Sequence, residues 1–185
     1  SGGAAIPQVR VSDLNMYYEA HGEGFPVLLV AGLGNDLNGW ASQVPEFSKK
    51  YRVVAFDNRG SGRTDAPDAP YSIQMMADDT AGLMNALGID EAHIVGVSMG
   101  GYIAQEVAIR YPGRVRSLIL ATTSVGPYLL KTSLLGSWAA AALKGINSKT
   151  LFQIMLPFMF NDRSFENPEV LDMAVEAIAA HSSTP

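Results

Sequence analysis

The sequence predicts an α/β protein built on a doubly wound, mostly parallel sheet, and two observations lead to this fold class. Short apolar runs alternate with helical patterns through the first 121 residues, as in chains that place helices on both faces of a parallel sheet. The segment Gly96–Gly100, which reads Gly-Val-Ser-Met-Gly, joins one of these apolar runs directly to a helical pattern. A strand followed at once by a helix is the repeating unit of such a sheet.

The first elements follow from local patterns. Val9–Ala20 predicts two short strands joined at Ser12 and Asp13, whose side chains can bond their own backbone and so favour a chain reversal. Pro26–Ala31 is apolar throughout, which suits a strand that is buried on both faces. Apolar residues at helical spacing then predict one helix over residues 40–50.

The next elements continue the alternation. Arg52–Phe56 predicts a second buried strand. Ser72 is placed to cap the start of a helix, and Gly88 to close it in the C′ position. The turn at Gly96–Gly100 leads into another helix, and Val115–Ala121 is a further β-rich run.

After about residue 124 the pattern changes, and no strand pattern returns. Three segments there are expected to be helical: Ser133–Lys144, Ser148–Met155 and Pro168–Ala180. We therefore expect two parts, residues 1–124 forming the N-terminal part of a sheet domain and residues 125–185 forming a helical segment.

Composition excludes several functional classes. The chain has 185 residues, of which 48% are hydrophobic, and its net charge of −5 is scattered without a basic patch. A nucleic-acid partner is therefore not expected. The absence of cysteine excludes disulfides, thiol chemistry and thiolate metal sites, and it is compatible with the reducing cytoplasm, where we expect the protein.

No segment resembles a membrane span or a signal peptide. The longest apolar stretch of the second half, Leu134–Leu143, is too short to cross a bilayer. No ligand cluster with metal spacing and no nucleotide-binding loop is visible. We expect no membrane partner and no metal or organic cofactor.

The turn around Ser98 carries the chemical signal of the sequence. In its context of strand, G-x-S-x-G and helix, it predicts a nucleophile elbow, a tight turn that exposes the serine hydroxyl. Gly96 and Gly100 are expected because neighbouring chain passes too close for side chains. Attack by Ser98 on an acyl carbon would create an oxyanion, and the backbone N–H of Met99 is one expected donor to it.

These features resemble the α/β-hydrolase superfamily, specifically its N-terminal part. The strongest stretches are Val27–Trp40, Val53–Thr64 and His93–Ala121. They are similar to small bacterial members such as 3-oxoadipate enol-lactonases, cofactor-free haloperoxidase-like perhydrolases, esterases and carbon–carbon bond hydrolases. The resemblance implies the superfamily fold, and it implies that residues 125–185 form a helical cap over the active site.

The resemblance also implies further site residues. The family pattern His-Gly-x-Gly after the first buried strand reads Ala-Gly-Leu-Gly here, so the N–H of Leu33 is the expected second oxyanion donor. Ala31 stands where the family usually has histidine, a change that bears on the rigidity of this loop. Gly34 and Trp40 are assigned to substrate binding, although Trp40 could equally start its helix in the core.

Other polar residues receive structural roles. Asp57 and Arg59 are expected to fix the turn at the end of their strand through hydrogen bonds. The pair Asp78 and Asp79, on the helix that Ser72 caps, is expected to be solvated.

The sequence offers no acid and no histidine at the positions expected for the groups that would activate Ser98. The resemblance requires an acid and then a histidine after the nucleophile, but His21, His93 and His181 do not have the expected position. The place after the sixth strand reads Ala-Thr-Thr-Ser over 121–124 and offers no acid. We therefore expect a chain without the C-terminal strands of the fold, whose apolar sheet edge is completed by a companion polypeptide or by self-association.

The leading functional prediction is a serine esterase or lactonase that acts on a small-molecule substrate through an acyl-enzyme on Ser98. Perhydrolase chemistry, with peroxide in place of water, would use the same residues. A ligand-binding pseudoenzyme and a catalytically inactive fragment are the alternatives from other classes.

Overall fold

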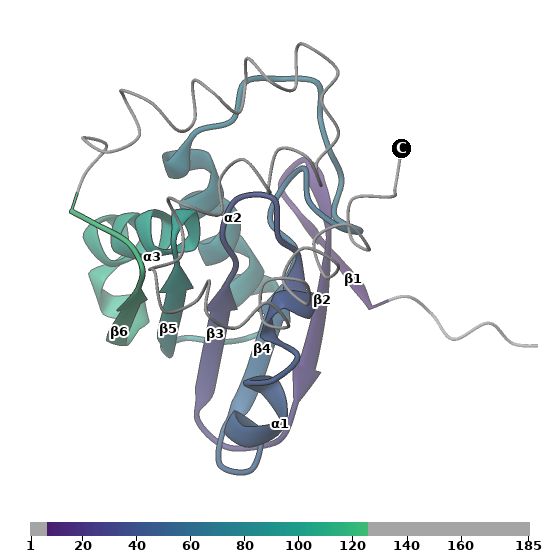
Figure 1. The fold of residues 1–185 in the computed structure, drawn as a ribbon. Coiled ribbons are helices and arrows are strands. Elements are labelled where there is room, and N and C mark those ends of the chain that lie inside the picture. Colours follow the sequence, from purple (N-terminus) through teal and green to yellow (C-terminus); the bar gives the residue numbers. More distant parts are fainter. Residues whose placement is uncertain (1–6, 126–185) are drawn as a thin grey trace, which may run out of the picture. The chain divides into compact units, whose positions relative to one another are not determined.

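The computed structural model describes residues 7–125, which form a six-stranded sheet flanked by helices (Figure 1). The sheet order is β1-β2-β4-β3-β5-β6. The strands are β1 (Gln8–Val11), β2 (Leu14–His21), β3 (Pro26–Val30), β4 (Arg52–Phe56), β5 (Ala92–Val97) and β6 (Val115–Ala121). The helices are η1 (Leu37–Trp40), α1 (Val44–Phe47), α2 (Ile73–Ala86), α3 (Met99–Arg110) and η2 (Pro112–Arg114).

The strand directions confirm the predicted fold class. β3 runs parallel to both β4 and β5, and β5 runs parallel to β6. Only the N-terminal hairpin is antiparallel: β1 pairs with β2, and β2 pairs with β4. The carboxyl ends of the four parallel strands therefore share one edge of the sheet, where sites of open α/β folds are found.

Alternating side chains of the parallel strands build a core on each face of the sheet. Leu28 and Val30 belong to the cluster that packs under α2 and α3, whereas Val27 and Leu29 belong to the cluster that includes η1 and contacts α1. Figure 1 shows α2 and α3 on one face and α1 on the other. Strands that are apolar at every position are needed because both faces are covered.

Both ends of α2 are capped as predicted. The hydroxyl of Ser72 accepts a hydrogen bond from the backbone N–H of Met75 at 3.1 Å. At the other end Gly88 adopts φ +65°, and the N–H of Ile89 reaches back to the carbonyl of Met84 at 2.8 Å. This is the glycine-terminated Schellman arrangement, which satisfies carbonyls that the helix end leaves free.

The single helix predicted over residues 40–50 is wrong. The chain forms two short helical turns instead, η1 and α1. Asp36 caps the first, because its carboxylate accepts from the N–H of Asn38 at 2.9 Å. Pro45 lies in the first turn of the second, where its missing N–H costs nothing. Two start signals nine residues apart leave no room for one continuous helix.

β6 lies at one end of the described sheet. Its residues Ile119 and Leu120 are 53% and 41% exposed. Completion of this edge by a companion polypeptide or by a second copy stays a prediction. The chain divides into two units between Val125 and Gly126, and the predicted cap helices and His181 lie outside the described residues. Between residues 7 and 125, no helix is long and apolar enough to cross a membrane.

Candidate active site

Ser98 occupies the turn between β5 and α3 with a strained backbone. Its φ of +54° and ψ of −119° lie in a region that residues with side chains rarely adopt. The turn is held by a hydrogen bond from the Ser98 N–H to the carbonyl of Ala121 at 3.0 Å. Ser98 is solvent-exposed, so its hydroxyl is available for chemistry. The sequence predicted the tight turn and the exposure of the serine.

The two glycines of the motif are required by the neighbouring chain. A Cβ on Gly96 would overlap the carbonyl oxygen of Gly100. A Cβ on Gly100 would overlap the carbonyl oxygen of Val30 and lie 2.7 Å from that of Ala31. The start of α3 thus packs directly on the end of β3, which fixes the height of Ser98 above the sheet.

Gly100→Ala is expected to destabilise the protein by about 1–3 kcal/mol, because the added methyl must push α3 away from the backbone of β3. Thermal unfolding measures this change. Gly113→Ala is the matched control, since no atom lies within 4 Å of a Cβ built there. Equal melting temperatures for the two variants would contradict the close packing.

The loop after β3 passes beside Ser98. A Cβ on Gly32 would lie 3.3 Å from the Ser98 Cβ and 3.8 Å from its Oγ. The N–H of Asn35 donates to the carbonyl of Gly32 at 3.3 Å, so Leu33 and Gly34 form the centre of a tight turn. Gly34 has φ +71°, the value that the third position of a type II turn requires. The predicted donor residue therefore directly follows the glycine that faces the serine.

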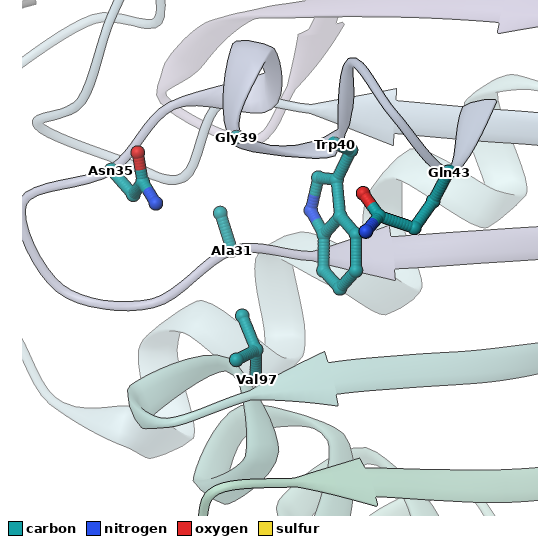
Figure 2. Close-up of a pocket in the computed structure, with 6 residues that line it drawn as sticks. All are labelled: Ala31, Asn35, Gly39, Trp40, Gln43 and Val97. Carbon is teal, nitrogen blue, oxygen red and sulfur yellow. The ribbon is translucent and has the colours of Figure 1, made fainter. Parts of the chain in front are cut away.

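Trp40 lines a hollow of about 200 Å³ on the α1 face of the sheet, at its carboxyl edge (Figure 2). The hollow is lined by Ala31, Asn35, Gly39, Trp40, Gln43 and Val97. Trp40 is also only 8% exposed and packs in the core cluster with Leu37 and Val53. Trp40 is thus a core residue, although it ends η1 and does not start a helix. Its role in substrate binding stays a prediction.

The indole Nε1 of Trp40 is buried and has no hydrogen-bond partner in the described part of the chain. Leaving a buried donor unpaired costs about 1–3 kcal/mol. The composition gave no indication of this feature.

Asp57 anchors the loops at this edge, as predicted. Its side chain is fully buried and accepts from the N–H of Leu37 and from the N–H of Arg63, each at 2.8 Å. Burial raises the pKa of the carboxyl above its ordinary value, and the two backbone donors offset part of this rise. Because Leu37 begins η1, this carboxylate helps to position Trp40.

The prediction for Asp79 is wrong, because this residue is buried. Its carboxylate accepts from Nε and Nη2 of Arg59 at 2.6 and 2.7 Å, and both side chains are about 5% exposed. Its neighbour Asp78 is exposed and pairs with Arg110 and Tyr111. The burial of Asp79 could have been predicted from the sequence, because Asp79 lies three residues after Met76, on the apolar face of α2.

His93 lies at the opposite edge from Ser98, as predicted. It pairs with Val27 at the start of β3, and its Nδ1 lies 2.6 Å from the Oγ of Ser117. His21 is also far from the serine, since it pairs with Val53 at the start of β4. Among residues 7–125, then, no histidine lies at the edge that carries Ser98, and no group of three His, Cys, Asp or Glu side chains forms a metal site.

The sheet order, the crossovers and the strained serine at a strand-to-helix turn define the class of α/β hydrolases. The family model described as "alpha/beta hydrolase fold" matches residues 26–148, and the chain belongs to this family.

Named relatives agree with this assignment. The chain is 38% identical over 115 residues to the putative carbamate hydrolase RutD of Azorhizobium caulinodans, covering 62% of this chain and 43% of RutD. It is 42% identical over 112 residues to the putative non-heme bromoperoxidase BpoC of Mycobacterium tuberculosis, covering 60% and 42%. The crystal structure of the enol-lactonase from Burkholderia xenovorans LB400 superposes with a TM-score of 0.77 and 30% identity, covering 95% of this chain and 68% of the enol-lactonase. The chain thus spans less than half the length of these two curated relatives.

Proposed function

We propose that this chain carries the nucleophile and the oxyanion donors of a serine hydrolase that cleaves carboxylic esters or lactones. The observation that carries the proposal is the exposed Ser98 with φ +54° at the β5–α3 turn. A protein retains such strain when the surrounding structure enforces it, and strained residues cluster at functional sites.

The reaction begins with attack of the Ser98 Oγ on the acyl carbon, while the hydroxyl proton passes to a base. The oxyanion that forms is held by the N–H groups of Met99 and Leu33. Met99 is the first residue of α3, and the first N–H groups of a helix have no partner within it. Collapse of the intermediate releases the alcohol and leaves an acyl group on Ser98, which water then removes. The base and the acid that orients it are expected from outside residues 7–125.

The names of the relatives support an acyl carbon bound to a heteroatom as the reacting centre. RutD is named a carbamate hydrolase, and the Burkholderia protein is named an enol-lactonase. Carbamates and lactones both react through a carbonyl that becomes an oxyanion. The proposed hydrolase therefore takes a small ester or lactone.

Perhydrolase activity is a second candidate, favoured by the similarity to a protein named a non-heme bromoperoxidase. Hydrogen peroxide would then take the place of water in the second half of the reaction, and release a peracid from the same acyl group on Ser98.

A fluorophosphonate probe tests the proposal, because it phosphonylates only an activated serine. We expect the full-length protein to be labelled at Ser98, as mapped by peptide mass, and the Ser98→Ala variant to remain unlabelled. Labelling of a different serine would contradict the assignment of the nucleophile. Absence of labelling in a folded protein would favour a pseudoenzyme.

A further inference from the structure

The loop after β3 carries the proposed oxyanion donor Leu33, but the residues around this donor do little to fix its position. The Leu33 side chain is 47% exposed, so packing holds it only weakly. Gly32 and Gly34, on either side, allow the backbone a wide range of conformations. An oxyanion donor lowers the barrier when its N–H is preorganised, so this loop needs support from elsewhere in the fold.

Asn58 supplies such support from the loop after β4, the strand that neighbours β3. Asn58 is only 2% exposed, and its Nδ2 donates to the carbonyl oxygen of Ala31 at 3.1 Å. Ala31 directly follows β3 (Figure 2), so this carbonyl lies beyond the last register pair of β3 with β4. We infer that Asn58 is a positioning residue, which orients the peptide between Ala31 and Gly32 and thereby holds the N–H of Leu33 toward the oxyanion. This inference rests on the proposed function.

The turn that carries Asn58 is itself well anchored. The preceding residue, Asp57, accepts hydrogen bonds from the backbone N–H groups of Leu37 and Arg63. The carbonyl of Asn58 accepts from the N–H of Ser61 at 3.0 Å. A side chain that starts from an ordered backbone and is buried loses little further entropy when its amide bonds a carbonyl. Asn58 can therefore hold the loop after β3 in place.

The carbonyl of Ala31 also borders the segment that carries the other proposed donor. A Cβ on Gly100 would lie 2.7 Å from this oxygen, and Gly100 directly follows Met99. On the other side of the same peptide, a Cβ on Gly32 would lie 3.3 Å from the Ser98 Cβ. The hydrogen bond to this carbonyl therefore acts where both donor segments and the nucleophile meet, and rotation of the peptide would change the spacing of the two donors.

Matched esters test the positioning role by kinetics in the full-length protein. We compare kcat/KM for p-nitrophenyl butyrate with that for O-(p-nitrophenyl) thionobutyrate, in which C=S replaces C=O. Sulfur accepts hydrogen bonds weakly, so the thiono ester gains little from the oxyanion donors. Asn58→Leu has a similar shape but loses the amide donor. We expect it to lower the ratio of oxo ester to thiono ester roughly threefold to tenfold, the range of one hydrogen bond. An unchanged ratio would overturn the inference.

Gln105→Met is the matched control, because it also removes a side-chain amide that supports a loop. The Nε2 of Gln105 donates to the carbonyls of Gly101 and Ser124, each at 3.0 Å, and so ties α3 to the segment after β6. We expect this variant to leave the ratio unchanged. An equal fall in both variants would overturn the inference, since it would reflect a general loss of order. If Asn58→Leu does not fold, Asn58→Ala provides the same comparison without the added branch.

Backbone hydrogen exchange tests the same role without catalysis. The N–H of Asn35 donates to the carbonyl of Gly32 and therefore reports on the closed turn around Leu33. By NMR we expect this N–H to exchange roughly threefold to tenfold faster in Asn58→Leu than in the wild type, and Gln105→Met to leave it unchanged. Equal exchange in the wild type and Asn58→Leu would overturn the inference. An inactive, unlabelled wild type whose Asn35 N–H still exchanges faster in Asn58→Leu would instead refute the proposed hydrolase alone.

Discussion

Ser98→Ala is expected to lower kcat for p-nitrophenyl butyrate by at least about 10⁴-fold in the full-length protein, because the reaction loses the atom that forms the acyl-enzyme. The stability should not fall, since the Ser98 side chain is exposed and forms no cap hydrogen bond to α3. Stopped-flow or steady-state hydrolysis and thermal unfolding measure the two quantities on the same sample.

Ser117→Ala is the matched control for this experiment. The Ser117 Oγ lies 2.6 Å from His93 Nδ1, so this serine has a histidine at hydrogen-bond distance that Ser98 lacks among the described residues. It stands on β6 near the amino edge of the sheet, however, away from the strained turn and the proposed oxyanion donors. We expect unchanged kcat for Ser117→Ala. An equal loss in both variants would show that the loss is not specific to the elbow.

The parts of this structure that the sequence predicted correctly are those with local causes. β3 and β4 were visible as nearly continuous apolar runs, because strands that are covered on both faces need apolar residues at almost every position. β5 and β6 were visible as β-rich runs despite their polar residues. The caps of α2 and the glycine pattern around Ser98 were also predictable. The caps and the turn at Ser98 depend on groups within a few residues, and Gly96 faces the carbonyl of Gly100, four residues on. Gly100 is the exception, because it is required by the distant backbone of Val30, and the motif itself revealed it.

The features that were missed depend on contacts between distant segments. Asp79 was expected to be solvated together with its neighbour Asp78, but the loop after β4 brings Arg59 to it from 20 positions away. The free N–H of Trp40 could not be predicted, since it depends on which acceptors the folded chain fails to supply. Sequence patterns indicate where polar groups are needed and rarely show which of them lack a partner.

The loop after β4 holds several elements around the candidate site in place. Asp57 fixes the start of η1, which carries Trp40, and it also fixes the turn at Arg63. Gly62 has φ +51°, and a Cβ there would overlap the Asp57 carboxylate, so this turn closes tightly on the carboxyl group. Arg59, two residues after Asp57, joins the same loop to α2. The Asp57 carboxylate thus supports η1, which contributes Trp40 to the hollow, while Arg59 holds the same loop against α2.

Asp79→Asn is expected to lower the free energy of unfolding by about 3 kcal/mol, which corresponds to a fall in Tm of roughly 6–12 °C. The asparagine has nearly the same shape, but it leaves the guanidinium of Arg59, whose side chain is 4% exposed, without its buried counter-charge. Asp13 does not compensate, because its Oδ1 is 3.7 Å from the guanidinium and its side chain is 57% exposed. Denaturant titration with a two-state fit measures the change.

Asp78→Asn is the matched control for Asp79→Asn. It removes the same charge one position away on α2, but from a partly exposed side chain. The Arg110–Asp78 pair has a short contact of 2.8 Å, but its side chains are 39% and 45% exposed. Water and salt screen such a pair, so its removal should change Tm far less than Asp79→Asn does. The effect of Asp78→Asn should also shrink in high salt, whereas that of Asp79→Asn should persist. If the two variants lost the same stability, burial of the Arg59–Asp79 pair would not be what holds the loop after β4 against α2.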